Sequence, residues 1–287
     1  MIIANPIYDV VFKKMMENER VAKFFIGTLL EQNIEAIEVK PQEFTYTDKL
    51  SALAVFRLDF IATIKTEAGE YKKVLIEIQK AKNLIDVMRF RNYLAEQYKK
   101  EDTIHNEKLA LPITTIYILG FTLPEIETPC LKVERNYIDH TNKTTLTTKS
   151  DFVEKLTHDS YIVQVERITG SYQTKLDKLL SIFEQANFAD DKKITKEFTH
   201  QIDAEEMKVT TDILHYSGTN LAEKKKIEDE QEAWRTVDAM AGDLREKLMR
   251  QNMALAASKK ALEEKDQALE NLKKEMEALR KQINQQP

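Results

Sequence analysis

Cysteine is nearly missing from this chain, since Cys130 is the only one in 287 residues. A single thiol excludes a disulfide framework. The five histidines are scattered along the chain, so neither they nor Cys130 show the spacing of a zinc site. Packing as a small apolar side chain is therefore the favoured interpretation of Cys130, with a catalytic nucleophile as the alternative.

Long apolar runs are missing as well. No stretch reaches the roughly 18 apolar residues of a membrane-spanning helix, and residues 1–14 lack the early charge and apolar block of a signal peptide. No P-loop, GxGxxG, GxSxG or HExxH motif occurs. We expect a soluble, cytoplasmic protein that does not contact membranes and binds no organic cofactor.

Positive charge is not in excess either. The chain has 43 Lys and Arg against 48 Asp and Glu, a formal net charge of −5. This balance counts mildly against nucleic acid as a partner. Basic residues do gather in one part of the chain, and that local cluster is either a solvated face or a surface that follows a phosphate backbone. Its members are Lys72, Lys73, Lys80, Lys82, Arg89, Lys99 and Lys100.

The most informative stretch is VFRLDFIATIKTEAGEYKKVLIEIQK, residues 55–80. Apolar and polar residues alternate over 55–65, and residues 73–80 are rich in β-branched and apolar side chains. Gly69 lies in the short connection between them. Period-two alternation on both sides of a turn residue predicts an antiparallel hairpin.

Two acids of this hairpin form a candidate site. If the hairpin closes symmetrically about Ala68, Asp59 lies opposite Glu77 with Cβ atoms about 5 Å apart. Two carboxylates at that distance need a proton or a cation between them, and hard oxygen ligands suit Mg²⁺ or Mn²⁺. The structural alternative is that Asp59 faces solvent and Glu77 pairs with Arg57 or a nearby lysine.

The alternation of side chains along a strand determines which neighbouring residues lie on the same face as the two acids. Side chains alternate between the two faces of a strand, so Gln79 shares the face of Glu77. Lys80 falls on the opposite face, among the apolar positions. Gln79 is therefore the predicted third polar group of the site.

The remaining periodicity predicts helices and strands on both sides of the hairpin. Pro41 indicates an edge position or a bulge for the strand that holds it, and the first helix has a possible interruption near Asn18. In chain order we expect a helix over 7–32, a strand over 35–47, the hairpin, a helix over 81–106, a buried strand over 113–121, strands over 131–138 and 161–168, and helices over 171–187 and 193–216.

Residues 221–287 form a different kind of sequence. Gly218 marks the expected domain boundary at 216–220, and beyond it apolar residues recur every 3.5 residues over about seven heptads, which predicts a coiled coil roughly 80 Å long. The alternative is a single helix packed back on the body. The a positions are Trp234, Ala241, Leu248, Leu255, Leu262, Leu269, Met276 and Ile283, and the d positions are Val237, Leu244, Gln251, Ser258, Lys265, Leu272 and Leu279.

The order α-β-β-β-α-β, with D-x17-E-x-Q on adjacent strands, resembles the PD-(D/E)XK nuclease superfamily. More closely, the chain resembles the bacterial recombination-promoting nuclease and putative transposase family. The resemblance rests on NPIYDVVFKKMM, RLDFIATIKTEAGEYKKVLIEIQKAK and RFRNYLAEQY. It covers residues 1–125 well, thins out to about 215 and does not include the coiled coil.

The resemblance implies an α/β fold with a restriction-endonuclease-like αβββαβ core. A mixed sheet flanked by helices is then followed by a helical region and the long C-terminal coiled-coil helix. We expect a nuclease-like core over 1–125, the remainder of the body over 126–216 and the coiled coil over 221–287. A homodimer or higher homo-oligomer is expected through residues 227–285.

The implied activity is metal-dependent hydrolysis of DNA phosphodiester bonds. Asp59 and Glu77 match the two metal-binding acids of the motif, and the implied cofactor is Mg²⁺ or Mn²⁺. Gln79 occupies the position of the motif lysine, and a neutral amide does not stabilise charge as an ammonium does. The alternative is therefore a catalytically inactive nuclease-fold protein that binds DNA or serves assembly. Possible accessory residues are Asp9, Lys80, Arg91 and Gln97.

Overall fold

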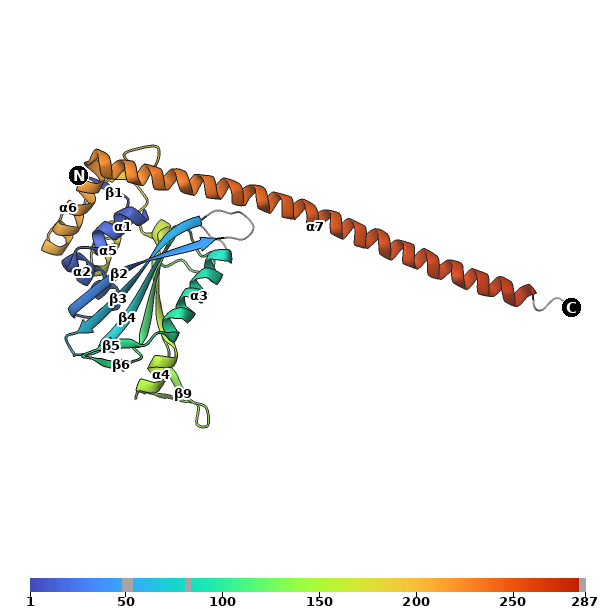
Figure 1. Ribbon diagram of the computed structural model, residues 1–287, viewed down its shortest axis with the longest axis horizontal. Helices are drawn as coiled ribbons and strands as arrows, with labels where there is room; N and C mark the ends of the chain where they lie inside the picture. Colours follow the sequence, from blue (N-terminus) through green and yellow to red (C-terminus); the bar gives the residue numbers. More distant parts are fainter. Residues whose placement is uncertain (48–53, 81–83, 284–287) are drawn as a thin grey trace. The chain divides into compact units, whose positions relative to one another are not determined.

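The computed structural model describes residues 1–47, 54–80 and 84–283; within these ranges, the side chains of 40–47, 54–59, 84–89 and parts of 237–283 lie outside the description (Figure 1). The chain divides into two compact units, Met1–Glu230 and Gln231–Pro287. The first unit is built on a β-sheet with helices on both faces, and the second consists of the greater part of one long helix.

The sheet of the first unit is mixed. Its first three strands are antiparallel, the third, fourth and fifth are parallel, and the last is antiparallel again. This arrangement confirms the predicted α/β class with a mixed sheet flanked by helices. The strand order is β2 (Ile34–Thr47), β3 (Ala54–Thr66), β4 (Tyr71–Gln79), β7 (Ile113–Leu119), β11 (His158–Gln164) and β8 (Cys130–Val133).

The predicted hairpin is confirmed as β3 and β4. Its register runs from Lys65 opposite Tyr71 to Phe60 opposite Ile76, which is the symmetric closure expected from the sequence. Gly69 has a φ of +84° in the turn, a conformation that glycine adopts without strain. Pro41 lies in β2 at the edge of the sheet, where its missing N–H interrupts no inner ladder.

One face of the sheet carries the larger core. The helix predicted over 7–32 is two helices, α1 (Asp9–Met16) and α2 (Glu19–Leu30), because Asn18 caps α2 by accepting a hydrogen bond from the Val21 N–H at 3.2 Å. The Phe12 ring meets the rings of Phe25 and Phe60 edge-on at 5.3 and 5.2 Å. Through these contacts α1 and α2 pack against the hairpin.

The other face is covered by α3 (Leu84–Lys99), which packs Phe90 and Tyr93 onto the sheet. The helix predicted over 81–106 is wrong beyond Lys99. There the chain forms a second hairpin, β5 (Asp102–Ile104) and β6 (Glu107–Leu109), because His105 and Asn106 adopt φ values of 52° and 67° in a tight turn.

The second half of the first unit departs most from expectation. The helix predicted over 171–187 is reduced to α5 (Lys175–Ser181), and the helix predicted from 193 is replaced at its start by β12 (Thr195–Glu197). β12 pairs with β1 (Ile2–Ala4), which lies at the start of the chain, and local periodicity does not reveal a contact between segments so far apart in sequence. The remaining elements are β9 (Tyr137–Asp139), β10 (Thr144–Leu146), α4 (Asp151–Leu156), a 3-10 turn (Val165–Arg167) and α6 (Glu205–Thr219).

Gly218 does not break a helix, as the sequence suggested, but lies buried inside α6. A Cβ at this position would lie 2.8 Å from the Ala4 nitrogen and 3.0 Å from the Ile3 carbonyl carbon. The missing side chain therefore allows α6 to approach the backbone of β1. The first compact unit continues past this point to Glu230.

This close approach makes Gly218→Ala a stability test. Alanine favours helices, yet here its methyl group meets backbone atoms, so we expect the free energy of unfolding to fall by about 1–3 kcal/mol. Gly242→Ala is the matched control, since a Cβ added at Gly242, also in a helix, would have nothing within 4 Å and should gain up to about 1 kcal/mol of helix propensity. Urea unfolding followed by circular dichroism measures both. An unchanged or more stable Gly218→Ala would contradict the close-approach explanation.

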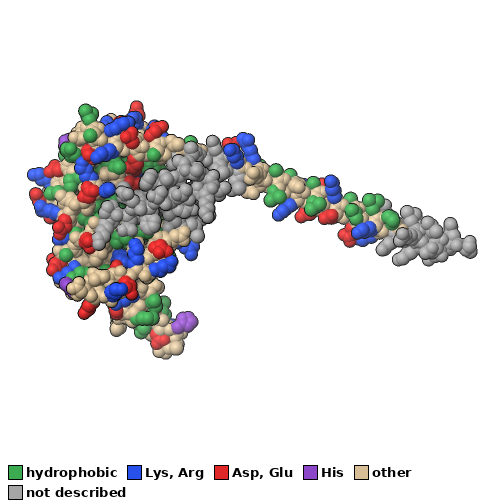
Figure 2. Space-filling view, viewed as in Figure 1, with side chains coloured by type: hydrophobic (Ala, Val, Ile, Leu, Met, Phe, Trp, Pro, Cys, Tyr) green, Lys and Arg blue, Asp and Glu red, His purple; other side chains and the backbone are tan. Residues whose placement is uncertain are grey.

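The long helix predicted at the C-terminus is confirmed as α7 (Leu221–Ile283). Its first turns belong to the body, since Ile227 is 1% exposed within the main core. The range 227–285 that is expected to form the oligomer therefore begins at a residue that is buried in the body. Predicted a and d positions farther along α7 are exposed, as the apolar side chains along its described part show (Figure 2). They are Leu255, Leu262, Leu269, Leu272 and Met276.

Candidate functional site

The candidate acid Glu77 lies in β4 beneath α3. Its side chain is 2% exposed, and Gln79, two residues further on, is 7% exposed. Leu75 packs with Phe90 on this face, whereas Ile76 belongs to the core of the opposite face. The structure therefore confirms that Glu77 and Gln79 share one side of the sheet.

The backbone of Asp59 lies where the sequence placed it. Phe60 pairs with Ile76 across the hairpin, so Asp59 is the next residue on β3 and Glu77 the next residue on β4. On its other side, Asp59 pairs with Gln42 of β2. The Asp59 side chain is outside the described residues, and the separation of the two carboxylates therefore stays a prediction.

The neighbours of Glu77 on the sheet are largely buried. Tyr117 of β7 pairs with Glu77, and its ring centroid lies 4.6 Å from that of Phe90. Burial raises the pKa of Tyr117 to about 12, although a hydrogen bond with Thr115 acts in the opposite direction. A carboxylate in such a dry setting is costly unless hydrogen bonds or a cation compensate its charge.

The donor atoms here fit a hard divalent cation, because a carboxylate and an amide oxygen are ligands that Mg²⁺ accepts. Among the residues that the structure describes, no group of three or more His, Cys, Asp and Glu side chains is placed to hold a metal ion. Glu77 is the one acid of the predicted pair whose side chain is described, so a metal site at this point would require Asp59 as well.

The accessory residues on α3 face different ways. Gln97 is buried, and its Nε2 finds no hydrogen-bond partner in the part of the chain that the structure describes. Arg91 lies on the exposed side of the helix. Gln97 therefore faces the sheet and Arg91 faces solvent.

The other two accessory residues, Asp9 and Lys80, lie on the α1 side of the sheet. The Lys80 ammonium pairs with the Glu230 carboxylate and lies 4.4 Å from the centroid of the Tyr8 ring. The backbone N–H of Asp9 donates to the same carboxylate at 3.0 Å. The structure thus gathers Asp9 and Lys80 around Glu230 rather than around Glu77.

Glu230 was missed by the sequence analysis. A signal for it exists, because continuing the heptads one repeat toward the N-terminus places Ile227 at an a position and Glu230 at a d position. A charged residue at a seam position is unfavourable in a coiled coil. It indicates that this turn of the helix has a different contact.

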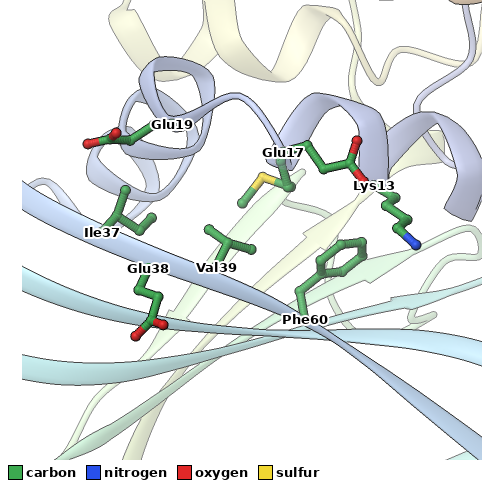
Figure 3. A pocket seen from close by; sticks show the side chains of 8 residues that line it. Lys13, Glu17, Glu19, Ile37, Glu38, Val39 and Phe60 are labelled. Atoms are coloured by element: carbon green, nitrogen blue, oxygen red, sulfur yellow. The ribbon is translucent and has the colours of Figure 1, made fainter.

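A cavity of about 340 Å³ opens on the α1 side of the sheet (Figure 3). Its charged lining is mostly acidic, with Glu17, Glu19 and Glu38 against Lys13. It lies beside Phe60, on the face of the sheet opposite to Glu77. Its charge makes it unsuited to a phosphate backbone.

Cys130 packs against the main core, as expected. Burial, together with the nearby Glu31 charge, raises the pKa of its thiol to about 11. The thiol is therefore protonated at neutral pH, which makes it a poor nucleophile.

Comparison of the chain with protein-family models, with curated proteins and with solved structures found no match. No helix within the described ranges is long and apolar enough to cross a membrane. The basis for a functional proposal is therefore the set of residues around Glu77 and their geometry.

Proposed function

We propose that this protein is a Mg²⁺-dependent DNA endonuclease of the recombination or mobile-element type, with a restriction-endonuclease-like core. Its site consists of Asp59, Glu77 and Gln79, and Mn²⁺ is an alternative metal. The observation that carries the proposal is the buried Glu77 in a central strand, at the point where the hairpin register brings Asp59 onto the facing strand. A cytoplasmic location is part of this proposal.

The roles of the three residues follow from their chemistry. Asp59 and Glu77 supply the carboxylate oxygens that hold the metal. A bound Mg²⁺ lowers the pKa of a water molecule and stabilises charge on the phosphate oxygens. Gln79 orients the attacking water or a phosphate oxygen through its amide, and the dry surroundings strengthen every charge interaction at the site.

Plasmid nicking with Mg²⁺, and with EDTA in its place, tests this function. The second candidate is a nuclease-fold protein without activity that binds DNA or serves assembly. Two observations favour it, namely Gln79 at the motif position and the net charge of −5. A chain that binds neither Mg²⁺ nor Mn²⁺ at millimolar concentration in calorimetry would support this second candidate.

Assembly is the other part of the proposal, and a second copy of the chain is the proposed partner of α7. One metal site cuts one strand, so a dimer supplies the two sites that a double-strand break needs. The exposed leucines at a positions of α7 provide the apolar seam of such a dimer.

Replacing both Leu262 and Leu269 by glutamate is expected to convert the assembled protein to monomer. Two glutamates per chain reduce the apolar area that the seam buries, and their charges repel those of the partner chain. Gln267→Glu is the matched control, because position 267 lies at f of the same heptad, away from the seam. Light scattering or sedimentation equilibrium measures the mass. A monomeric wild type, or equal masses for all three proteins, would argue against the seam.

A further inference from the structure

One carboxylate at the start of α7 makes three polar contacts with the body. Glu230 accepts hydrogen bonds from the backbone N–H groups of Asp9 and Val10, each at 3.0 Å, and pairs with the Lys80 ammonium. We call this set the Glu230 latch. The side chains of Glu230 and Lys80 are 13% and 15% exposed, so water screens the pair only weakly.

The latch also completes the N-terminus of α1. The N-cap residue, Tyr8, provides no side-chain hydrogen bond to the first turn. Glu230 supplies that acceptor from 221 positions farther along the chain. A carboxylate at a helix N-terminus gains from the helix dipole and from charge-assisted hydrogen bonds.

The latch reaches the strand of the candidate site through Lys80, the residue directly after Gln79. The Gly120 N–H donates to the Gln79 carbonyl at 2.8 Å. A Cβ at Gly120 would lie 2.9 Å from the Lys80 carbonyl oxygen, so the backbone at Lys80 has little room to move. Glu230 therefore holds the side chain of Lys80, while Gly120 encloses its backbone.

The latch uses the same face of α7 as the predicted seam. Ile227 is buried in the body, and both Ile227 and Glu230 fall at seam positions one heptad before Trp234 and Val237. Ile227 and Glu230 cannot be buried against the body and against a second copy of α7 at the same time. Pairing of two copies is therefore limited to the turns after Glu230 as long as the latch is closed.

We propose that Glu230 is a positioning residue that couples α7 to the end of β4. Pairing of the seam with a second copy is one change that affects the start of α7. Such a change weakens the ion pair between Glu230 and Lys80, and the position of Gln79 and Glu77 changes as a result. The effect on metal binding rests on the proposed function, whereas the effect on the end of β4 does not.

A double-mutant cycle in the full-length chain tests this coupling. It compares Glu230→Ala, Lys80→Met and the double variant, with Glu230→Gln as the conservative change. Glu228→Ala is the matched control, because Glu228 lies on the same turn and makes an exposed ion pair with Lys192 at 3.3 Å. Hydrogen exchange of the Asp9, Val10 and Gly120 amides is measured by NMR, and Mg²⁺ affinity is measured by calorimetry.

We expect Glu230→Ala to speed exchange of the Asp9, Val10 and Gly120 amides about tenfold. Mg²⁺ affinity should fall several-fold, whereas Glu228→Ala should leave it at the wild-type value. Glu230→Gln should restore part of the protection at Asp9 and Val10, since its amide oxygen still accepts a hydrogen bond. The double variant should be no worse than either single variant at Gly120, because both act through one pair.

Wild-type exchange at Gly120 in Glu230→Ala would overturn the coupling, even if Asp9 and Val10 exchanged faster. Additive effects of Glu230→Ala and Lys80→Met would overturn it too. A wild type that binds no Mg²⁺ would instead refute the proposed function. The Gly120 exchange rates would then decide the coupling by themselves.

Discussion

Glu77→Gln is expected to reduce Mg²⁺-dependent plasmid nicking by about 100-fold or more. The substitution keeps the size of the side chain and removes the negative charge that the metal requires. Because Glu77 is 2% exposed, solvent screens the loss of its charge only weakly. Asp59→Asn should have an effect of the same size if the two acids share one ion.

The matched control is Glu70→Gln in the same hairpin. Glu70 makes an exposed ion pair with Lys72 at 3.3 Å, and its loss should leave nicking unchanged. Circular dichroism and the unfolding midpoint show whether each variant keeps its fold. Wild-type nicking by a folded Glu77→Gln protein would falsify the site.

The free energy of unfolding of the protein should rise with pH because of a second buried residue, Lys196. Its side chain is 2% exposed, and its Nζ donates to the carbonyls of Ser181 and Glu184 at 3.1 and 2.6 Å. Burial lowers the pKa of Lys196 to about 7, against the opposing charge of Glu184. The unfolded chain keeps the ordinary value near 10.5.

The sign follows from proton binding. Between pH 7 and about 10.5 the unfolded chain holds a proton that the folded chain has lost, so the stability contribution of Lys196 increases as the pH rises. Below pH 7 both states are protonated, and above about pH 10.5 both are neutral, so the contribution is flat outside this window. The full gain is on the order of 5 kcal/mol.

Urea unfolding of wild type and Lys196→Met at several pH values between 6 and 10 measures this gain. The methionine removes the titration and leaves a constant offset, so the difference between the two curves isolates Lys196 from the other titrating groups. We expect the difference in free energy of unfolding between wild type and variant to increase steadily in favour of the wild type above pH 7. Parallel curves would mean that Lys196 stays charged in the folded protein up to its ordinary pKa.

The hairpin shows how far local pattern reaches. Alternation and a short turn at Gly69 leave little freedom of register, so the pairing of Phe60 with Ile76 was predictable. The same alternation placed Glu77 and Gln79 on one face and Lys80 on the other. The interruption at Asn18 was also visible, because an asparagine side chain caps a helix through local hydrogen bonds.

At β12 and Gly218, contacts between residues far apart in the sequence determined the structure, and the local sequence pattern predicted it wrongly. β12 stands where a helix was expected because it pairs with β1, which is far from it in the sequence but adjacent in the fold. Gly218 resembles a boundary glycine, yet its lack of a side chain serves the approach of α6 to β1.

The sequence by itself determined the α/β class, the hairpin with its two faces and the long C-terminal helix, because these depend on periodicity and on turns between neighbouring residues. Only the tertiary structure decided that Glu77 is buried under α3, that Asp9 and Lys80 meet Glu230 rather than Glu77, and that the first turns of α7 belong to the body. Those features join residues far apart in the chain, and their energies come from burial and charge in a packed interior that no local pattern records.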